Sequence, residues 1–222
     1  QCRAFDLEYL GDVLDYNTED ECEENGGIWY GADGVAMDYD TEDECEDIIE
    51  YHHTWEYKEG RISQQDPETK ETDSVKSDYR ICTLYHPPCN DELEQFNWLN
   101  TKLLKIITKV NQDYYKFNIQ ALAEAPNLMR YDAENLGHYD YHLDIGQLKP
   151  NCWRKLSYSL MLNDDYEGGE FQFANYSEEK CNIHTPVPNK TGTAIVFPSD
   201  TEHRVTPVTS GVRKTLIMWG LK

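Results

Sequence analysis

The sequence predicts a mainly β protein with supporting helices, and two observations carry that prediction. After Tyr114 the chain consists of about eight short β-rich runs broken by Gly, Pro and Asn, the texture of a sandwich or barrel. Before them, apolar residues recur at three- and four-residue intervals from Leu93 to Tyr114, the spacing of an amphipathic helix. A helix packed outside a double-stranded β-helix, the jelly-roll or cupin-like fold, accounts for both halves.

Charge divides the chain. Residues 1–50 contain 18 Asp or Glu and one basic residue, a net charge of −17, whereas the other 172 residues carry −5. We therefore predict an acidic helical appendage over residues 1–50 and a double-stranded β-helix domain over residues 51–222, which includes a support helix at 91–112. Such an acidic field repels nucleic acid and attracts cations or basic proteins, although a solvated face explains it more simply.

The appendage contains a repeat. DYNTEDECEENGG at Asp15–Gly27 and DYDTEDECEDIIE at Asp38–Glu50 are offset by 23 residues. In both copies a threonine, Thr18 or Thr41, stands three residues before a glutamate, which is the reciprocal capping arrangement at the start of a helix. We therefore expect two short acidic helices.

Cysteine usage and hydropathy indicate the compartment. The seven cysteines are odd in number and form no CxxC pair, which favours reduced thiols in a cytosol-like compartment. Cys22 and Cys45 occupy equivalent positions in the repeat, so an oxidised pair there stays an alternative. No apolar run approaches the ~18 residues needed to cross a bilayer. We expect a soluble, cytoplasmic protein without a membrane partner, in the host cytoplasm if the source is viral.

The remaining elements follow in chain order. Thr54–Ile62 and Asp78–Tyr85 are predicted strands, and the polar Gln64–Ser77 stretch between them is predicted to be a mobile loop. Asp91 opens the support helix. The later strands are predicted at DYYKFNI, NLMRYD, HYDYHLD, KLSYSLMLN, GEFQFAN, GTAIVFPS, HRVTPV and RKTLIMWG.

Three side chains predict a metal centre. In a strand, residues i and i+2 point to the same side, so His142 and Asp144 can reach one ion together. His203 follows after a gap of 58 residues, and Arg213 lies ten residues further, on the last predicted strand. Two imidazoles and one carboxylate on one face are the ligand set of iron(II) centres that keep positions open for dioxygen. A guanidinium at Arg213 suits the far carboxylate of a dicarboxylate.

The motifs around these residues resemble one family. RYDAENLGHYDYHLD, RKLSYSLMLNDDYEGGEFQF and GTAIVFPSDTEHRVTPVTSGVRKTLIMWG are similar to the 2-oxoglutarate oxygenases of the prolyl 4-hydroxylase type. The resemblance covers about Thr54 to Lys222, and Arg213 places it with the arginine-bearing branch. It implies a double-stranded β-helix that uses Fe(II), 2-oxoglutarate and dioxygen, with ascorbate as an additional candidate.

The resemblance also assigns residues. His138-Tyr139-Asp140 is a competing HxD, but only His142 has the family's tyrosine, Tyr139, three residues before it. The residues expected at the 2-oxoglutarate site are Arg213, Tyr131 and Trp219. Those expected to line the pocket or contact substrate are Tyr139, Ser157, Ser159, Met161, Arg80 and Trp55, for which packing is the competing interpretation.

The family implies an enzyme that couples oxidative decarboxylation of 2-oxoglutarate to hydroxylation of a substrate. The first expectation is a prolyl residue in a peptide or protein, which the acidic segment suggests is basic. A second hypothesis is another residue or a small metabolite as the substrate. A third, of a different class, is an acidic protein-interaction module with a vestigial metal site. An open groove beside Gln64–Ser77 would favour a peptide, and a closed pocket would favour a small molecule.

Overall fold

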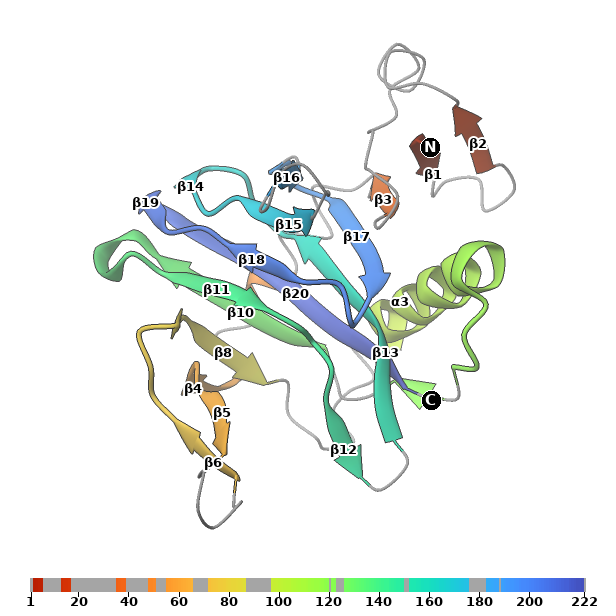
Figure 1. The fold of residues 1–222 in the computed structure, drawn as a ribbon. Coiled ribbons are helices and arrows are strands. Elements are labelled where there is room, and N and C mark those ends of the chain that lie inside the picture. The colour runs from red at the N-terminus through yellow and green to blue at the C-terminus, as the bar shows by residue number, and fades with distance from the viewer. Residues whose placement is uncertain are drawn as a thin grey trace.

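Strands dominate the described chain, which confirms the predicted mainly β fold. The computed structural model describes residues 2–5, 13–16, 35–38, 48–50, 55–65, 72–86, 97–119, 121–122, 126–149, 152–175, 183–187 and 189–221. Two antiparallel sheets and one long helix make up most of these residues (Figure 1).

The larger sheet has nine strands among the described residues. Their order is β3-β17-β13-β20-β10-β8-β4, with β12 beside β13 and β9 beside β20. The bounds are β3 Val35–Asp38, β4 Glu56–Glu59, β8 Thr83–His86, β9 Ala121–Leu122, β10 Asn127–Asp132, β12 Gln147–Lys149, β13 Cys152–Met161, β17 Thr193–Pro198 and β20 Val212–Leu221.

The smaller sheet has five strands in the order β16-β15-β18-β11-β7, and three two-stranded pairs complete the described strands. The sheet contains β7 Arg80–Ile81, β11 His138–His142, β15 Phe171–Asn175, β16 Ile183–Val187 and β18 His203–Val205. The pairs are β1 Cys2–Phe5 with β2 Val13–Tyr16, β5 Ile62–Gln65 with β6 Thr72–Val75, and β14 Glu167–Gly168 with β19 Val208–Ser210.

The support helix covers one face of the larger sheet. Helix α3 spans Asn97–Val110 and continues into a π-helical turn, η3, at Asn111–Tyr115, while η4 is a 3-10 turn at Ala133–Asn135. Leu103, Ile107 and Val110 are buried in one cluster with Leu156, Leu160 and other residues of the sheet. The expected packing of the apolar stripe on the sheet is therefore confirmed. No helix in the described part of the chain is long and apolar enough to cross a membrane.

The two sheets face each other across a second core. This cluster combines Tyr131 and Phe197 of the larger sheet with Phe171, Phe173 and Val205 of the smaller one. Two facing antiparallel sheets of this kind form the double-stranded β-helix that the sequence predicts. Three layers result: helix, larger sheet, smaller sheet.

Strand alternation on β13 and β20 separates apolar from polar side chains. Leu156 and Leu160 of β13, and Leu216 and Met218 of β20, pack in the cluster that contains helix α3. The residues between them on β13 include Ser159, a side chain that is buried on the opposite side of the strand. The larger sheet thus has an apolar face toward the helix and a partly polar face toward the smaller sheet.

The EGGE sequence forms a turn, as the glycines suggest. Gly168 and Gly169 have φ of +70° and +59°, values that side-chain-bearing residues rarely adopt. A Cβ at Gly169 would lie 3.0 Å from Cδ of Arg213 and 2.9 Å from Val208. Glycine at position 169 therefore allows the backbone conformation of the turn and avoids a close contact with the Arg213 side chain.

Two predicted elements are wrong. DYYKFNI is not a strand: the Asn111 side-chain amide donates to the Phe117 carbonyl at 2.7 Å and accepts from the Phe117 N–H at 2.8 Å, which folds the segment back on the helix end. The Gln64–Ser77 stretch is not simply a loop, because its ends belong to the paired strands β5 and β6. This hairpin was not predicted because its strands are rich in polar residues.

Some expectations fall outside the described residues. These are the helix start at Asp91 and most of the two helices expected from Thr18 and Thr41, although residues 48–50 in the second copy are helical. A Cys22–Cys45 pair lies outside them too. Within the first 50 residues the described strands β1 and β2 pair with each other, and β3 pairs with β17 at the edge of the larger sheet.

Two adjacent leucines on helix α3 test the helix–sheet packing. Leu103 is fully buried, whereas Leu104 is 47% exposed. Leu103→Ala should lower the free energy of unfolding by about 2–5 kcal/mol, because it removes buried methyl groups and leaves a cavity. Leu104→Ala should change it by less than about 0.5 kcal/mol. Urea unfolding followed by circular dichroism measures both, and similar losses in the two variants would contradict this packing.

Candidate metal and co-substrate site

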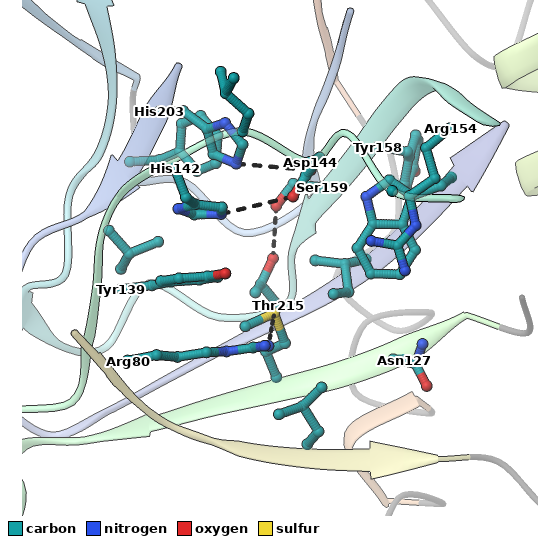
Figure 2. Close-up of a pocket in the computed structure, with 18 of the residues that line it drawn as sticks. Arg80, Asn127, Tyr139, His142, Asp144, Arg154, Tyr158, Ser159, His203 and Thr215 are labelled. Atoms are coloured by element: carbon teal, nitrogen blue, oxygen red, sulfur yellow. Dashed lines mark hydrogen bonds and ion pairs between the residues drawn. The ribbon is translucent and has the colours of Figure 1, made fainter. Parts of the chain in front are cut away.

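The register of two strands brings the predicted metal ligands together. β11 pairs antiparallel with β18 so that His142 stands opposite His203. Asp144 follows two residues after His142 and is anchored by its backbone N–H, which donates to the Ser199 carbonyl at 2.9 Å. The Asp144 carboxylate oxygens lie 3.6 Å from Nε2 of His142 and 3.7 Å from Nε2 of His203 (Figure 2).

Backbone contacts orient both imidazoles. Nδ1 of His142 is 2.8 Å from the Asp140 carbonyl, and Nδ1 of His203 is 2.9 Å from the Thr201 carbonyl. Because a carbonyl only accepts, each Nδ1 carries a proton, and each Nε2 is left facing the Asp144 carboxylate. Burial and the neighbouring His203 lower the pKa of His142 to about 3, so this imidazole is neutral at ordinary pH.

Asp144 is held as a carboxylate. Burial by itself raises its pKa, but His203, His142 and hydrogen bonds from Ser157 and Trp219 outweigh burial and hold the pKa of this carboxyl below its usual value. Its side chain is only 14% exposed. A buried carboxylate therefore stands beside the Nε2 atoms of both imidazoles, where a cation would offset its negative charge.

The three residues fit a metal ion. His142, Asp144 and His203 each offer one potential metal-ligand atom, and these three atoms lie within 4.8 Å of one another. Ligands about 2.1 Å from one ion and at right angles to each other would be about 3 Å apart, so a small inward movement suffices. Two imidazoles and one carboxylate on one side are the donor set of non-haem iron(II) sites with open positions.

A buried arginine lies in the same cavity. Arg213 on β20 is fully buried and stands opposite Tyr131 on β10, with its guanidinium 5.4 Å from the tyrosine ring centre. One guanidinium nitrogen contacts the Met161 sulfur at 3.3 Å. Its Nε and Nη1 have no hydrogen-bond partner among the described residues. A buried cation with unsatisfied donors is costly unless an anion binds there, and a carboxylate fits two of those donors.

Tyr131 contributes a second donor beside Arg213. Burial raises the pKa of its hydroxyl, which therefore keeps its proton. The hydroxyl contacts only the weakly accepting Met129 sulfur, at 3.6 Å, among the described residues. It is available to donate to a ligand carboxylate. The metal ligands and this donor pair line one cavity of about 730 Å³, which also includes Trp219.

Sequence comparisons agree with this chemistry. Residues 126–220 match the family model described as the 2OG-Fe(II) oxygenase superfamily. A PKHD-type hydroxylase from Aliarcobacter butzleri is 30% identical over 168 residues, which cover 59% of this chain and 70% of that protein. The chain belongs to the 2OG-Fe(II) oxygenase superfamily. The family implies Fe(II) and 2-oxoglutarate as its cofactors, and the site just described has donors for both.

Other relatives set the extent of the likeness. A PKHD-type hydroxylase from Synechococcus is 36% identical over 88 residues, 39% of this chain and 37% of that protein, so the match spans little more than a third of its length. A prolyl hydroxylase from Trichoplax adhaerens, solved with a hypoxia inducible factor peptide, has a TM-score of 0.62 at 14% identity over 86% of this chain and 84% of that one. That likeness shows a shared fold.

The oxygenase fold places three of the six predicted pocket residues at the cavity. Ser159, Tyr139 and Arg80 line it. The Tyr139 ring stacks on His142 with centres 3.4 Å apart, and Ser159 bonds to Thr215 at 3.0 Å. Ser157 contacts the Asp144 carboxylate and does not line the cavity.

Two predicted pocket residues lie elsewhere. Met161 does not line the cavity, because it is buried in the core between the sheets, with its sulfur against Arg213. Trp55 is buried in the helix–sheet core, so packing is the correct interpretation of this residue. The competing His138 turns away from the cluster and bonds to the backbone carbonyls of Leu136 and Asp78, at 2.7 and 2.8 Å.

Several cavity residues were not predicted. Thr215 could have been found by strand parity, since it follows Arg213 by two residues on β20. Asn127 has the same kind of signal, since it precedes Tyr131 by four residues on β10. Arg61 and Arg154 carry no comparable signal, because they reach the cavity from segments far apart in the chain. Leu143 and Ile145 flank Asp144 and are about half exposed at the cavity's edge.

The two HxD motifs provide a matched test of the oxygenase's metal site. Manganese(II) added to metal-free protein should raise the Tm, since a ligand that binds only the folded state stabilises it. His142→Ala should remove that increase, because one of the three ligand atoms is lost. His138→Ala should retain it, whatever its own Tm. Differential scanning calorimetry measures both, and loss of the increase only in His138→Ala would transfer the site to the other motif.

Proposed function

We propose that the chain hydroxylates a prolyl residue of a peptide or protein substrate, with iron held by His142, Asp144 and His203 and 2-oxoglutarate anchored by Arg213. The observation that carries the proposal is the meeting of three clustered ligand atoms and a buried, unsatisfied arginine in one cavity. When bound, iron and 2-oxoglutarate would supply oxidation by dioxygen, coupled to decarboxylation to succinate and carbon dioxide, and ascorbate would serve as an auxiliary reductant.

The chain's own residues would orient these partners. Arg213 would bind the far carboxylate of 2-oxoglutarate through its free Nε and Nη1, and Tyr131 would donate its hydroxyl proton to the same group. Ser157 and Trp219 would keep the Asp144 carboxylate aimed at the metal. The apolar rings of Phe171 and Phe197, which line the cavity, would exclude water from the oxidation.

The shape of the cavity supports a peptide substrate. The cavity reaches the surface at Arg61 and Ile62, where hairpin β5–β6 begins, and at the exposed Tyr79, Leu143 and Ile145. An opening with exposed apolar side chains at its edge suits an extended chain that passes over the metal. The Trichoplax prolyl hydroxylase was solved with a peptide and shares this fold. A small metabolite remains the second candidate, because the cavity of about 730 Å³ also falls in the range of small-molecule sites.

Turnover tests the proposal directly. The iron-loaded protein with 2-oxoglutarate and proline-containing peptides should release succinate and yield a peptide heavier by one oxygen atom, both detected by mass spectrometry. The matched control replaces proline by alanine in each peptide. Succinate release with only free small molecules would favour the metabolite, and no iron-dependent product from any proline-containing peptide would remove the prolyl assignment.

Arg213 has its own test. Arg213→Gln removes the charge that would pair with 2-oxoglutarate, and loss of one partner of a buried charge pair costs at least about 2 kcal/mol, roughly thirtyfold in affinity. Isothermal titration of the manganese-loaded protein with 2-oxoglutarate should show this loss, while manganese affinity stays within about threefold of the native value. Unchanged 2-oxoglutarate affinity would exclude Arg213 as the anchor.

A further inference from the structure

The cavity has a charge opposite to that of the chain. The protein carries a formal net charge of −22. Among the described residues that line the cavity, Asp144 is the only carboxylate, and the cations are Arg61, Arg80, Arg154 and Arg213. One metal dication and one 2-oxoglutarate dianion would leave this excess of arginine unchanged. A positive cavity in an acidic protein therefore calls for negative charge from the substrate.

Arg80 lies close to the reaction centre. Its guanidinium carbon is 4.6 Å from the centre of the Tyr139 ring, and Tyr139 stacks on His142 (Figure 2). Only one aromatic ring therefore separates this cation from a metal ligand. A substrate group that reached Arg80 would place its neighbouring atoms close to the metal.

The contacts of Arg80 hold it in place without neutralising it. Its Nε contacts the Cys82 sulfur at 3.3 Å, one Nη donates to the Arg61 carbonyl at 3.1 Å, and the other is 4.0 Å from the Met129 sulfur. The described ion pairs do not include Arg80. Sulfur atoms are weak acceptors, so the guanidinium retains most of its capacity for a carboxylate.

Arg213 and Arg80 have separable tasks. Arg213 is fully buried behind Tyr131, as an anchor for the co-substrate requires, whereas Arg80 is half-buried and bonds to Arg61 near the surface. Arg80 is thus the cation that a substrate entering from solvent meets beside the metal ligands.

We propose that Arg80 is a specificity-determining residue that binds a carboxylate of the substrate, so the substrate is an acidic peptide with Asp or Glu beside the oxidised residue. This inference rests on the proposed function and names its substrate class. It reverses the expectation from the acidic N-terminal segment, which favours a basic substrate. A lysine in this cavity would face several arginines at close range, where salt screens their repulsion little.

Peptide binding tests the inference without turnover. Three dye-labelled, C-terminally amidated peptides of equal length, centred on Glu-Pro-Glu, Ala-Pro-Ala and Lys-Pro-Lys, are titrated with protein loaded with manganese and 2-oxoglutarate. Binding is measured by fluorescence anisotropy at about 0.15 M salt. At that ionic strength the electrostatic field of the chain's charges is screened beyond about 8 Å. The acidic peptide should bind about tenfold to a hundredfold more tightly than the others, as expected for a charged hydrogen-bonded pair. A fourth peptide, Ala-Pro-Ala with a free C-terminal carboxylate, distinguishes a terminal carboxylate from a side-chain one.

Variants identify the residue responsible. Arg80→Gln should abolish the preference for the acidic peptide, and Arg80→Lys should retain part of it. Lys105→Gln removes one positive charge from an exposed position on helix α3 and should keep the full preference. In Arg80→Gln, 2-oxoglutarate affinity and the manganese-dependent rise in Tm should stay at their native values, which shows that the site is intact.

Each result decides between outcomes. Equal affinity for the acidic and neutral peptides, or tighter binding of the basic one, would overturn the inference. So would a loss of 2-oxoglutarate affinity in Arg80→Gln as large as the loss of peptide affinity, because Arg80 would then serve the co-substrate. Tight, Arg80-dependent binding of the acidic peptide, together with no iron-dependent product from any proline-containing peptide, would support the inference while removing the prolyl assignment.

Discussion

The antiparallel register of β11 and β18 is the constraint on which the site depends. It sets His142 opposite His203, and Asp144 then reaches both imidazoles because it lies just beyond the end of β11. Strand register is discrete: a shift of one residue would turn each side chain to the other sheet face. The aromatic core between the sheets holds this register, since Phe171 packs on both Phe197 and His203.

The alternation of side chains along a strand also explains how the fold contains a polar cavity beside an apolar core. β13 and β20 present apolar residues to helix α3 and place Ser159, Arg213 and Thr215 on the other face. Buried hydroxyls find partners there, as in the Ser159–Thr215 bond. Arg213 differs: among the described residues its Nε and Nη1 have no hydrogen-bond partner, and another of its nitrogens contacts the Met161 sulfur. An anion bound at Arg213 would offset that cost.

Charge is arranged on two scales. The first 50 residues supply most of the acidity, while arginines outnumber carboxylates among the described residues of the cavity. The cavity charges act on a bound group at contact distance, where salt screens them little. The net charge of the whole chain therefore does not indicate the charge of a group that binds beside His142. The charges of the residues that line the cavity do.

Strand and helix periodicity predicted the double-stranded β-helix and the support helix, because such patterns are local. Residue spacing and the family resemblance together predicted His142, Asp144, His203 and Arg213, which the structure brings to one cavity. Which other residues share the cavity became clear from the three-dimensional structure. Trp55 and Met161 looked like pocket residues, yet one packs under the helix and the other beneath Arg213. Arg61 and Arg154 came to the cavity through sheet pairing between segments far apart in the chain. Such long-range pairing has no local signature, so the charge of the cavity could not be read from the sequence.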